Sequence, residues 1–419
     1  MRSIVRLLLA IAGGMLVVQC HEVSLTAPRP ITALPRALSA AETGLISADN
    51  RFAFSLFGEI ARQTSPDSNL FISPLSAAMA LAMAYNGAAG ATQAEMQQVL
   101  QLDGMTLDDV DQSYRSLIGL LRGLDPEVAF TIANSVWYDP DPVYAPTPDY
   151  LAATRTYFDA RVESLDFKSP SAAPTINAWV SDQTHGKIPT IVPDAIPPDV
   201  VAYLINAIYF KGNWTARFDK SLTRPGAFRL ANGAAATVPM MTHGHAVRVG
   251  YARAEGVTVL DLPYGGEAFS MTIALPQDAA GIDSLVQGLS EERWRGWVAA
   301  LDSGSFEVVM PKFALTYGLT MNDVLKALGM PSAFCDSWHP DFTRMNPTGA
   351  LCITDVRHKA FVDVNEEGTE AAAATSVGIG FTSIGPTLVM VDRPFVFAIR
   401  ERLSGTILFL GRVMNPAAT

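Results

Sequence analysis

The residues that could perform catalysis are few and widely separated in this chain. It contains no Gly-x-Ser-x-Gly nucleophile turn, no His-Glu-x-x-His zinc pattern and no phosphate-binding loop. Two of its six histidines, His243 and His245, lie close together, but no carboxylate or thiol lies near them in the sequence. Two ligands in one loop seldom hold a metal ion. We therefore predict no metal, no cofactor and no enzymatic activity.

Residues 365–375 (NEEGTEAAAAT) indicate a different kind of chemistry, in which a loop changes its conformation. Alternate side chains of an extended strand point to the same face. One face would carry small or β-branched residues suited to a buried sheet: Thr369, Ala371, Ala373, Thr375, Val377 and Ile379. Gly368 can adopt the backbone angles of a hinge. From these residues, two interpretations stay open: a loop that can insert as a strand, or an Ala-rich helix that precedes a Gly-rich loop.

Six segments within residues 47–416 resemble the serpin family and occur in the same order as in that family. The most informative is residues 364–375 (VNEEGTEAAAAT), which are similar to the hinge of the reactive-centre loop of inhibitory serpins. The others are residues 69–76 (NLFISPLS), 206–214 (NAIYFKGNW), 262–264 (LPY), 356–361 (VRHKAF), and 392–397 (DRPFVF) followed by 409–413 (FLGRV). The resemblance implies an α+β fold with three β-sheets, about eight to nine helices and an exposed reactive-centre loop. Residues 46–419 would form one domain, with the loop at residues 366–392.

The resemblance also implies the function, which is suicide inhibition of a serine protease. The protease would cleave the loop and stay covalently attached while the loop inserts into the central sheet. The family's hinge corresponds here to Glu366, Glu367, Gly368, Thr369, Glu370, Ala371, Ala372, Ala373 and Ala374. The alternative is a non-inhibitory serpin that acts as a binding or carrier module. Bulky or charged residues in the hinge after Glu370 would indicate that alternative, and none is present.

The reactive bond is placed by counting along the loop. In the family it usually follows the seventeenth residue from the hinge glutamate, which from Glu366 is Thr382, so the bond would join Thr382 to Ser383. The loop is one residue longer than in common members, which leaves Phe381 or Ser383 as alternatives. No Lys or Arg lies between Glu370 and Arg393. We therefore predict elastase-like or subtilisin-like targets, then chymotrypsin-like ones through Phe381, and not trypsin.

Two polar groups of residues match positions that control insertion in serpins. Ser73, Ser76, Asn206 and His358 match a hydrogen-bonded cluster, the shutter, beneath the sheet where it parts. Without the resemblance, Asn206 would be interpreted as a polar plug in the core and Ser73 as a helix cap. Trp214, Lys312 and Glu366 match the breach, where insertion begins. An ion pair there would hold the base of the loop, although most exposed pairs contribute less than about 1 kcal/mol.

The first twenty residues resemble a targeting segment and are excluded from the fold. Arg2 and Arg6 precede an apolar run at residues 7–18 that is too short to span a bilayer, so we predict a signal peptide. Cleavage before Cys20 would expose a cysteine that bacteria can acylate, but Gln19 replaces the small residue of a lipobox, so lipidation stays open. Residues 21–45 are rich in Pro, Ala, Ser and Thr and are predicted to be a flexible tether. We expect an exported, bacterial protein that is secreted, periplasmic or lipid-anchored.

Charge and length limit the partners and the domain count. Removing residues 1–20 would remove two of the 30 basic residues and none of the 41 acidic ones, which changes the net charge from −11 to −13. This balance argues against binding of nucleic acid. Heparin-activated serpins carry a basic patch near residues 91–124; acidic residues occur in and just beyond that region here: Asp103, Asp108, Asp109, Asp111, Asp125 and Glu127. Heparin binding is therefore not expected, and a monomer is. The 419 residues alone would suggest two or three domains, but no linker divides the chain after residue 45.

Cys335 and Cys352 are the two cysteines besides Cys20. In an exported chain they could form a disulfide worth on the order of 3 kcal/mol. The alternative is two separately buried thiols, because connectivity cannot be deduced from spacing. We favour the disulfide.

The elements that position these residues follow from periodicity. Helices are predicted at residues 50–62 and 74–87, the second with Ser73 as its N-cap, and a capping box at residues 92–95 opens a third. Strands are predicted at residues 128–138, 201–210, 269–275 and 306–312, most of which are dense in β-branched and aromatic residues.

Overall fold

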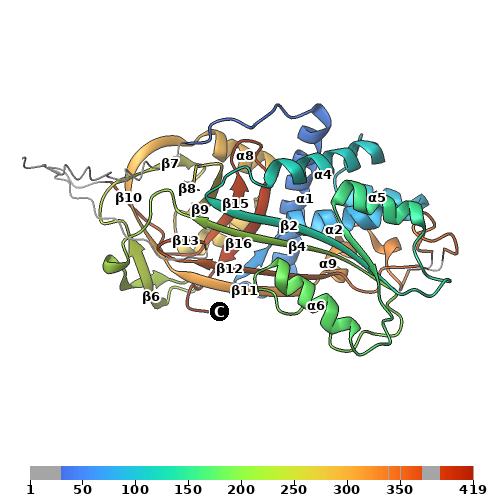
Figure 1. Cartoon of the computed structure of the whole chain (residues 1–419). Helices are drawn as coiled ribbons and strands as arrows, with labels where there is room; N and C mark the ends of the chain where they lie inside the picture. The colour runs from blue at the N-terminus through green and yellow to red at the C-terminus, as the bar shows by residue number, and fades with distance from the viewer. Residues whose placement is uncertain (1–29, 338, 350, 370–386, 419) are drawn as a thin grey trace, which may run out of the picture.

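A computed structural model describes residues 30–337, 339–349, 351–369 and 387–418. Within these residues the chain forms an α+β fold in which helices surround two sheets (Figure 1). The α-helices are α1 (Ala40–Gln63), α2 (Pro74–Gly87), α3 (Gly90–Val99), α4 (Leu107–Leu121), α5 (Pro148–Phe158), α6 (Ala172–Gln183), α7 (Ile282–Gln287), α8 (Glu291–Ala299) and α9 (Asn322–Leu328). The signal peptide, Cys20, residues 370–374 of the hinge and the predicted reactive bond lie outside the described residues.

The six-stranded sheet contains the strands that concern the predicted hinge. Its order is β11 (Phe313–Thr320), β12 (Arg357–Val364), β13 (Gly368–Thr369), β4 (Ala202–Asn213), β2 (Val128–Tyr138) and β3 (Arg161–Ser164). The strands β4 and β2 are paired along eleven residues, from Ala202↔Tyr138 to Gly212↔Val128. The start of β2 is as predicted, and β4 runs three residues further than predicted.

The second sheet divides at one shared strand, β10. Its order is β1 (Leu70–Ile72), β16 (Ile407–Val413), β15 (Phe395–Glu401), β9 (Phe269–Pro276), β8 (Val257–Tyr264), β7 (Val247–Ala254), β10 (Asp302–Pro311), β6 (Ala235–Thr242) and β5 (Arg224–Arg229), and β14 (Thr387–Met390) also pairs with β10. The first half of β10 pairs with β7, whereas the second half pairs with β14 and β6. These two strand groups and the six-stranded sheet correspond to the three sheets that the sequence predicts.

Helix α2 lies between the two sheets and contacts β4 on one side and β16 on the other. All its residues except Ala80 are buried, as expected of a helix that is apolar on every face. Pro74 occupies its first turn, and the Ser73 side chain accepts a hydrogen bond from the Ser76 N–H, so the predicted N-cap is confirmed. Because α2 is fixed by both sheets, its first turn delivers Ser73 and Ser76 to the underside of the six-stranded sheet.

Two predicted boundaries are wrong. Helix α1 begins at Ala40 instead of residue 50, with Ser39 and Glu42 forming a capping box, and Leu45 is fully buried. Residues 40–45 are therefore part of the folded domain and not of the predicted tether. The prediction was wrong because the capping box lies in a stretch whose composition is typical of linkers. Helix α3 begins at Gly90, and Thr92 lies inside it, where its hydroxyl accepts the Asp341 N–H instead of capping the helix.

Within the described part of the chain, no helix combines the length and apolarity needed to cross a membrane.

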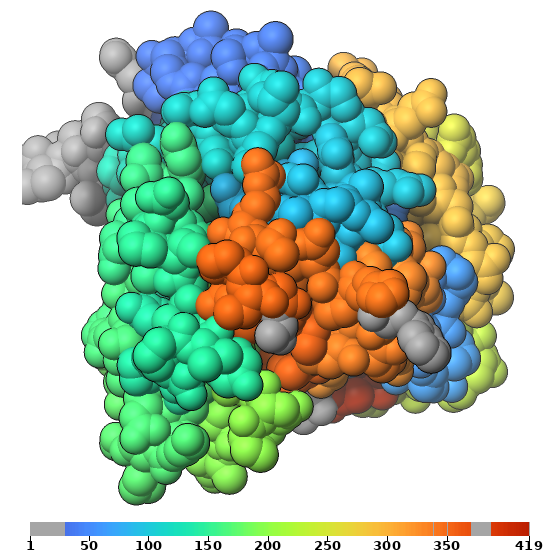
Figure 2. Space-filling view, turned by 90° about the vertical axis from the view of Figure 1, so that its right-hand side faces the viewer, coloured from blue at the N-terminus to red at the C-terminus, as the bar shows by residue number. Residues whose placement is uncertain are grey.

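Cys335 and Cys352 form a disulfide that fastens the segment between α9 and β12. Figure 2 is viewed onto this end of the molecule, and the orange chain around residues 340–355 occupies the centre of the surface. The backbone of Cys335 donates to the Ile353 carbonyl, so the two chain segments are also joined by a main-chain hydrogen bond. Cys335 is exposed and Cys352 is half-buried. The disulfide thus closes the end of the fold from which β12 departs.

The disulfide should contribute measurably to stability, because its two cysteines are 17 residues apart and closing a loop of that length is worth about 3 kcal/mol. We expect the double variant Cys335→Ser/Cys352→Ser to unfold at a lower urea concentration than the wild type without reductant. A reductant should lower the wild-type midpoint to that of the variant and leave the variant unchanged. A wild-type midpoint that is equal to that of the variant and insensitive to reductant would contradict the pairing.

Candidate functional site

The candidate site is the gap between strands β4 and β12. In the part of the chain that the structure describes, β4 pairs with β2 and with β13, and β12 pairs with β11 and with β13. Within the described residues, the two strands share no ladder with each other and are joined through the two residues of β13. An edge of unpaired backbone groups readily accepts a further strand. The gap is therefore a place where this sheet can be extended from within.

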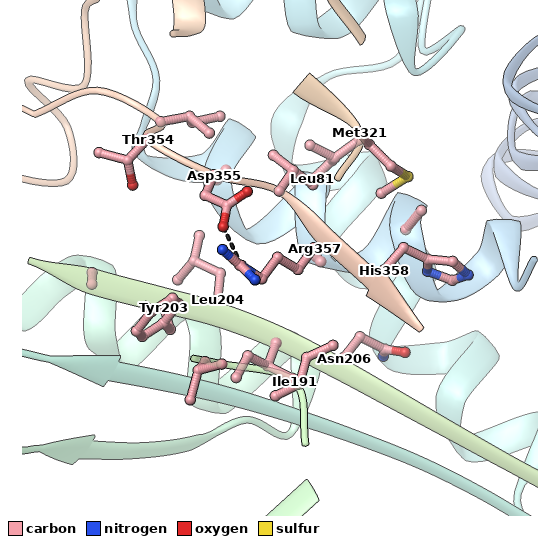
Figure 3. A pocket seen from close by; sticks show the side chains of 18 of the residues that line it. Leu81, Ile191, Tyr203, Leu204, Asn206, Met321, Thr354, Asp355, Arg357 and His358 are labelled. Atoms are coloured by element: carbon pink, nitrogen blue, oxygen red, sulfur yellow. Dashed lines mark hydrogen bonds and ion pairs between the residues drawn. The ribbon is translucent and has the colours of Figure 1, made fainter. Parts of the chain in front are cut away.

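Cavities mark the gap along its length. One of about 140 Å³ lies between the first half of β4 and the start of β12 and reaches the side of α2. Leu204 and Asn206 come from β4, and Arg357 and His358 from β12, on opposite sides of the space shown in Figure 3. A smaller cavity of about 20 Å³ lies further along, between residues 208–210 and 361–363 and beside Thr369. The walls of the larger cavity are mainly apolar, as the core position of an inserted strand requires.

Gly368 and Thr369, the only hinge residues with strand structure among those described, already lie in this gap. Gly368 is opposite Asn213 and Thr369 is opposite Gly212, while Val364 of β12 is opposite Thr369. A Cβ atom on Gly368 would lie 2.0 Å from the Gly212 carbonyl oxygen, so this position requires glycine. The hinge therefore begins as a strand paired on both sides.

Thr369 is buried and contacts Tyr264 of β8, which the sequence analysis did not assign to the site. The Thr369 hydroxyl and the Tyr264 phenol are 2.7 Å apart and form a hydrogen bond. The Tyr264 ring stacks on Trp214 at 4.4 Å, with 13° between the ring planes. Tyr264 belongs to the LPY segment that carried the family resemblance, but the sequence indicated no role for it. In the structure, Tyr264 contacts Thr369, the last hinge residue described in the gap.

The breach residues meet at the base of the hinge. Trp214 donates its indole N–H to the Asn365 carbonyl at 2.9 Å and its backbone N–H to the Glu367 carbonyl at 2.8 Å. Lys312 Nζ lies 2.8 Å from Glu366 Oε2, which forms the predicted ion pair. Three groups thus hold the chain at residues 365–367, immediately before it enters the gap.

Two further partners of the glutamates were not predicted from the sequence. The Thr223 hydroxyl donates to Glu366 Oε1 at 2.7 Å, and Lys220 forms an ion pair with Glu367. Burial alone would raise the pKa of Glu366, but the hydrogen bonds from Lys312 and Thr223 outweigh it and hold that pKa below its usual value. Both glutamates are buried at 4% exposure, whereas the side chains of Lys220 and Lys312 are 59% and 37% exposed, so solvent screens the lysine side of each ion pair.

The shutter residues form a chain of hydrogen bonds that crosses the gap through α2. His358 Nε2 on β12 accepts the Ser73 N–H at 3.0 Å, and the Ser73 hydroxyl accepts the Ser76 N–H at 3.4 Å. The Ser76 hydroxyl then donates to the Asn206 carbonyl on β4 at 3.1 Å. The two strands are therefore tied to one helix instead of to each other.

The side chain of Asn206 is directed to a partner that the sequence analysis missed. Its Nδ2 donates to Asn134 Oδ1 on β2 at 2.7 Å, and Asn134 in turn donates to the Phe158 carbonyl. The Oδ1 atom of Asn206 is buried and has no hydrogen-bond partner among the described residues. A buried acceptor without a donor costs on the order of 1–3 kcal/mol. This wall of the gap therefore retains a polar group that closure or insertion could satisfy.

His243 is packed against an aromatic ring and a backbone carbonyl. His243 is buried, stacks on Phe218 at 4.0 Å and hydrogen-bonds the Ala216 carbonyl through Nε2. Among the described residues, no group of three or more His, Cys, Asp or Glu side chains is arranged to hold a metal ion. His243 therefore has a packing role beneath the breach.

Comparison with known proteins identifies the family. The family model Serpin (serine protease inhibitor) matches residues 47–416. This chain is a serpin. The bovine leukocyte elastase inhibitor is 37% identical over 89% of this serpin and 99% of that protein, and the fruit fly serine protease inhibitor 42Dd is 34% identical over 85% and 94%. The predicted family and fold are confirmed.

Two solved structures are similar over nearly the whole serpin domain. The native state of tengpin, a thermophilic serpin, has a TM-score of 0.80 at 29% identity and covers 93% of this chain and 97% of its own. Human thyroxine-binding globulin, solved in complex with its ligand, has a TM-score of 0.80 at 28% identity and covers 90% and 100%. The structural relatives thus include a protein named for small-molecule binding.

His358 makes the shutter of this serpin dependent on pH. Its Nε2 accepts a hydrogen bond, so the ring is neutral and carries its proton on Nδ1. Burial lowers the pKa of His358 to about 4. The pKa of histidine in an unfolded chain is about 6.5. Between pH 6.5 and pH 4, the unfolded chain therefore binds a proton at His358 that the native state does not bind. Native stability is therefore lost as the pH falls through this window.

The variant His358→Gln should isolate this effect, because glutamine offers an acceptor to Ser73 and does not titrate. From pH 7 to pH 5 we expect the wild type to lose about 2 kcal/mol relative to the variant, measured as the pH dependence of thermal unfolding. Burial also lowers the pKa of His243 to about 4 and raises those of Asp49 to about 7 and Asp111 to about 6. These three groups are common to both proteins and cancel in the difference. Parallel pH profiles would refute the role of His358.

Proposed function

We propose that this serpin inhibits serine proteases as a suicide substrate whose cleaved loop fills the gap between β4 and β12. The observation that carries the proposal is the paired, buried start of the loop at Gly368–Thr369. Its two neighbours share no ladder beyond that point in the described part of the chain. Strand addition there would give both edges their hydrogen bonds.

The chemistry is an acyl transfer in which the acylation step occurs and the deacylation step does not. The protease serine attacks the carbonyl carbon of the reactive bond, its proton passes to the protease histidine, and the amine of the new chain end leaves with that proton. The serpin is then held as an ester on the protease serine. Insertion of about fourteen loop residues would move the attached protease by roughly 45 Å. The distorted protease active site would then fail to bring water to the ester.

The reactive bond proposed for this loop joins Thr382 to Ser383, with Phe381 or Ser383 as alternative positions before the bond. A medium-sized, uncharged residue at that place suits elastase-like and subtilisin-like proteases, and Phe381 would suit chymotrypsin-like ones. The resemblance to an elastase inhibitor over 99% of that protein's length supports the first class.

We further propose that the protein is exported and acts as a monomer. The disulfide between Cys335 and Cys352 supports export, since such bonds persist in oxidising compartments. The apolar run at residues 7–18 and the preceding arginines would direct that export. Acylation of Cys20 would add a lipid anchor, and intact-mass measurement of the mature chain distinguishes the two forms.

A carrier function is the second candidate, and the likeness to thyroxine-binding globulin favours it. A carrier would not need the hinge to enter the sheet. The glycine requirement at Gly368 and the bond from Thr369 to Tyr264 are features of a hinge built for insertion. They support the inhibitor.

Incubation with elastase, subtilisin, chymotrypsin and trypsin tests the proposal. We expect a band at the summed mass that survives denaturation with elastase or subtilisin, and a released C-terminal peptide that begins at Ser383 by mass spectrometry. Trypsin should form no such complex. Cleavage of the loop without any stable complex, across a wider protease panel, would favour the carrier.

The variant Ala373→Glu should fold but become a substrate. The proposed insertion would bury residue 373, which lies four positions beyond Thr369 in the hinge, and an uncompensated charge costs several kcal/mol to bury. Because each ~1.4 kcal/mol is a factor of ten in rate, slower insertion should raise the number of serpin molecules consumed per protease at least about tenfold. Thr43→Glu, at an exposed position of α1, is the matched control. Equal stoichiometry in the two variants would exclude insertion at this hinge.

A further inference from the structure

Strand β14 exposes large apolar side chains at the C-terminal end of residues 366–392, the predicted reactive-centre loop. Leu388 is 50% exposed and Met390 is 42% exposed, whereas Val389 and Val391 between and after them are buried. Only three other large apolar residues are exposed in the described part of the chain, namely Val143, Tyr144 and Leu222. The side chains of β14 alternate between solvent and the protein interior as in a regular strand, and this alternation places Leu388 and Met390 in solvent.

The neighbouring strand extends this surface. In the parallel pairing of β14 with β10, Leu388 is opposite Glu307 and Met390 is opposite Val309. Residues opposite each other in a sheet share a face, and Val309 is half-buried between the buried Val308 and Met310. We call Leu388, Met390 and Val309 the β14 patch. Glu307 lies at its border.

The β14 patch is held rigidly. The Val391 N–H donates to the Val309 carbonyl at 2.8 Å, and Asp392 forms ion pairs with Arg229 at 2.9 Å and with Arg393 at 2.7 Å. Among the described residues, β14 pairs with β10 alone. Edge strands are normally protected by charge or covered by another element. A fixed, apolar edge suits a surface that a partner covers, because little ordering is needed on binding.

We propose that the β14 patch is a secondary docking surface for the target serine protease, contacting apolar side chains that border the protease cleft beyond the cleaved bond. This inference rests on the proposed inhibitory function. From Ser383 to Leu388 the chain spans five residues, or at most roughly 17 Å. A protein interface of about 800 Å² per partner has a radius of about 16 Å. At any separation short of full extension, a protease centred on the reactive bond therefore reaches Leu388 at the start of this strand.

The size of the patch favours a protease over a second copy of this chain. Two partly exposed side chains and Val309 provide far less than the about 800 Å² per partner of a stable interface. They suffice as an addition to the contacts that a protease makes with the loop. The patch should therefore strengthen the first, reversible encounter and leave the later acylation and insertion steps unchanged.

The double variant Leu388→Ser/Met390→Ser tests the proposal against a matched control, Val143→Ser/Tyr144→Ser. The control removes a similarly exposed apolar pair, at 51% and 36%, from the loop that precedes α5. Figure 1 shows α5 at the end of the molecule opposite β6 and β10. Both variants change exposed residues, so both should keep the wild-type thermal midpoint. If the midpoint of the double β14 variant falls, the single variant Leu388→Ser is used in its place.

The rate of inhibition of elastase, or of whichever panel protease the wild type traps, is measured against serpin concentration. For the β14 variant we expect the second-order rate constant to fall about fivefold to tenfold. The limiting rate, the stoichiometry and the covalent band should match the wild type, and the control should stay within twofold of it. An unchanged rate constant in the β14 variant overturns the docking surface while the inhibitor stands.

The remaining outcomes also decide the question. A lower limiting rate or a raised stoichiometry would show that β14 acts in insertion and not in docking, which overturns the proposal. A change of oligomeric state in sedimentation, at unchanged inhibition, would assign the patch to self-association. If the wild type traps no protease at all, the inhibitory function fails and the docking surface fails with it.

Discussion

Strands β4 and β12 lie in one sheet, but they share no ladder in the described part of the chain, and the rest of the structure depends on this. Backbone N–H and C=O groups at the centre of a sheet are stabilised when each has a partner. Among the described residues, the ones that supply partners to both edges are Gly368 and Thr369. Beyond them, the described part of this sheet is one strand short of the arrangement that would satisfy both edges.

Such a state persists only if something prevents spontaneous completion. The two ends of the gap are held in different ways. At the breach, Lys312, Thr223 and Lys220 hold Glu366 and Glu367, and Trp214 binds the backbone on either side of Glu366. At the shutter, helix α2 ties β12 to β4 through Ser73 and Ser76. Polar contacts are suited to this task, because each contributes little and can be broken once cleavage releases the loop.

In the proposed mechanism, inhibition and target choice are located in different parts of this molecule. The gap and the shutter belong to the six-stranded sheet and would decide whether a trapped protease is moved. The loop residues near Thr382 would decide which protease cleaves, and the β14 patch on the second sheet would add contacts beyond the bond. Target specificity would then change through exposed residues such as Leu388, whereas Thr369 and Tyr264 at the start of the hinge are buried.

The sequence by itself determined the family, the α+β class and both ends of β2 and α2, because these depend on local patterns and motif order. It also predicted the shutter and breach residues, whose described members the structure brings into contact. It missed the start of α1 at Ala40, where linker-like composition hid a capping box. Only the tertiary structure showed that Thr369 already rests on Tyr264, that Lys220 and Thr223 hold the glutamates, and that Asn134 takes the side chain of Asn206. The physical reason is sequence distance: Thr369 and Tyr264 are 105 residues apart, and no local pattern records which strands will be neighbours.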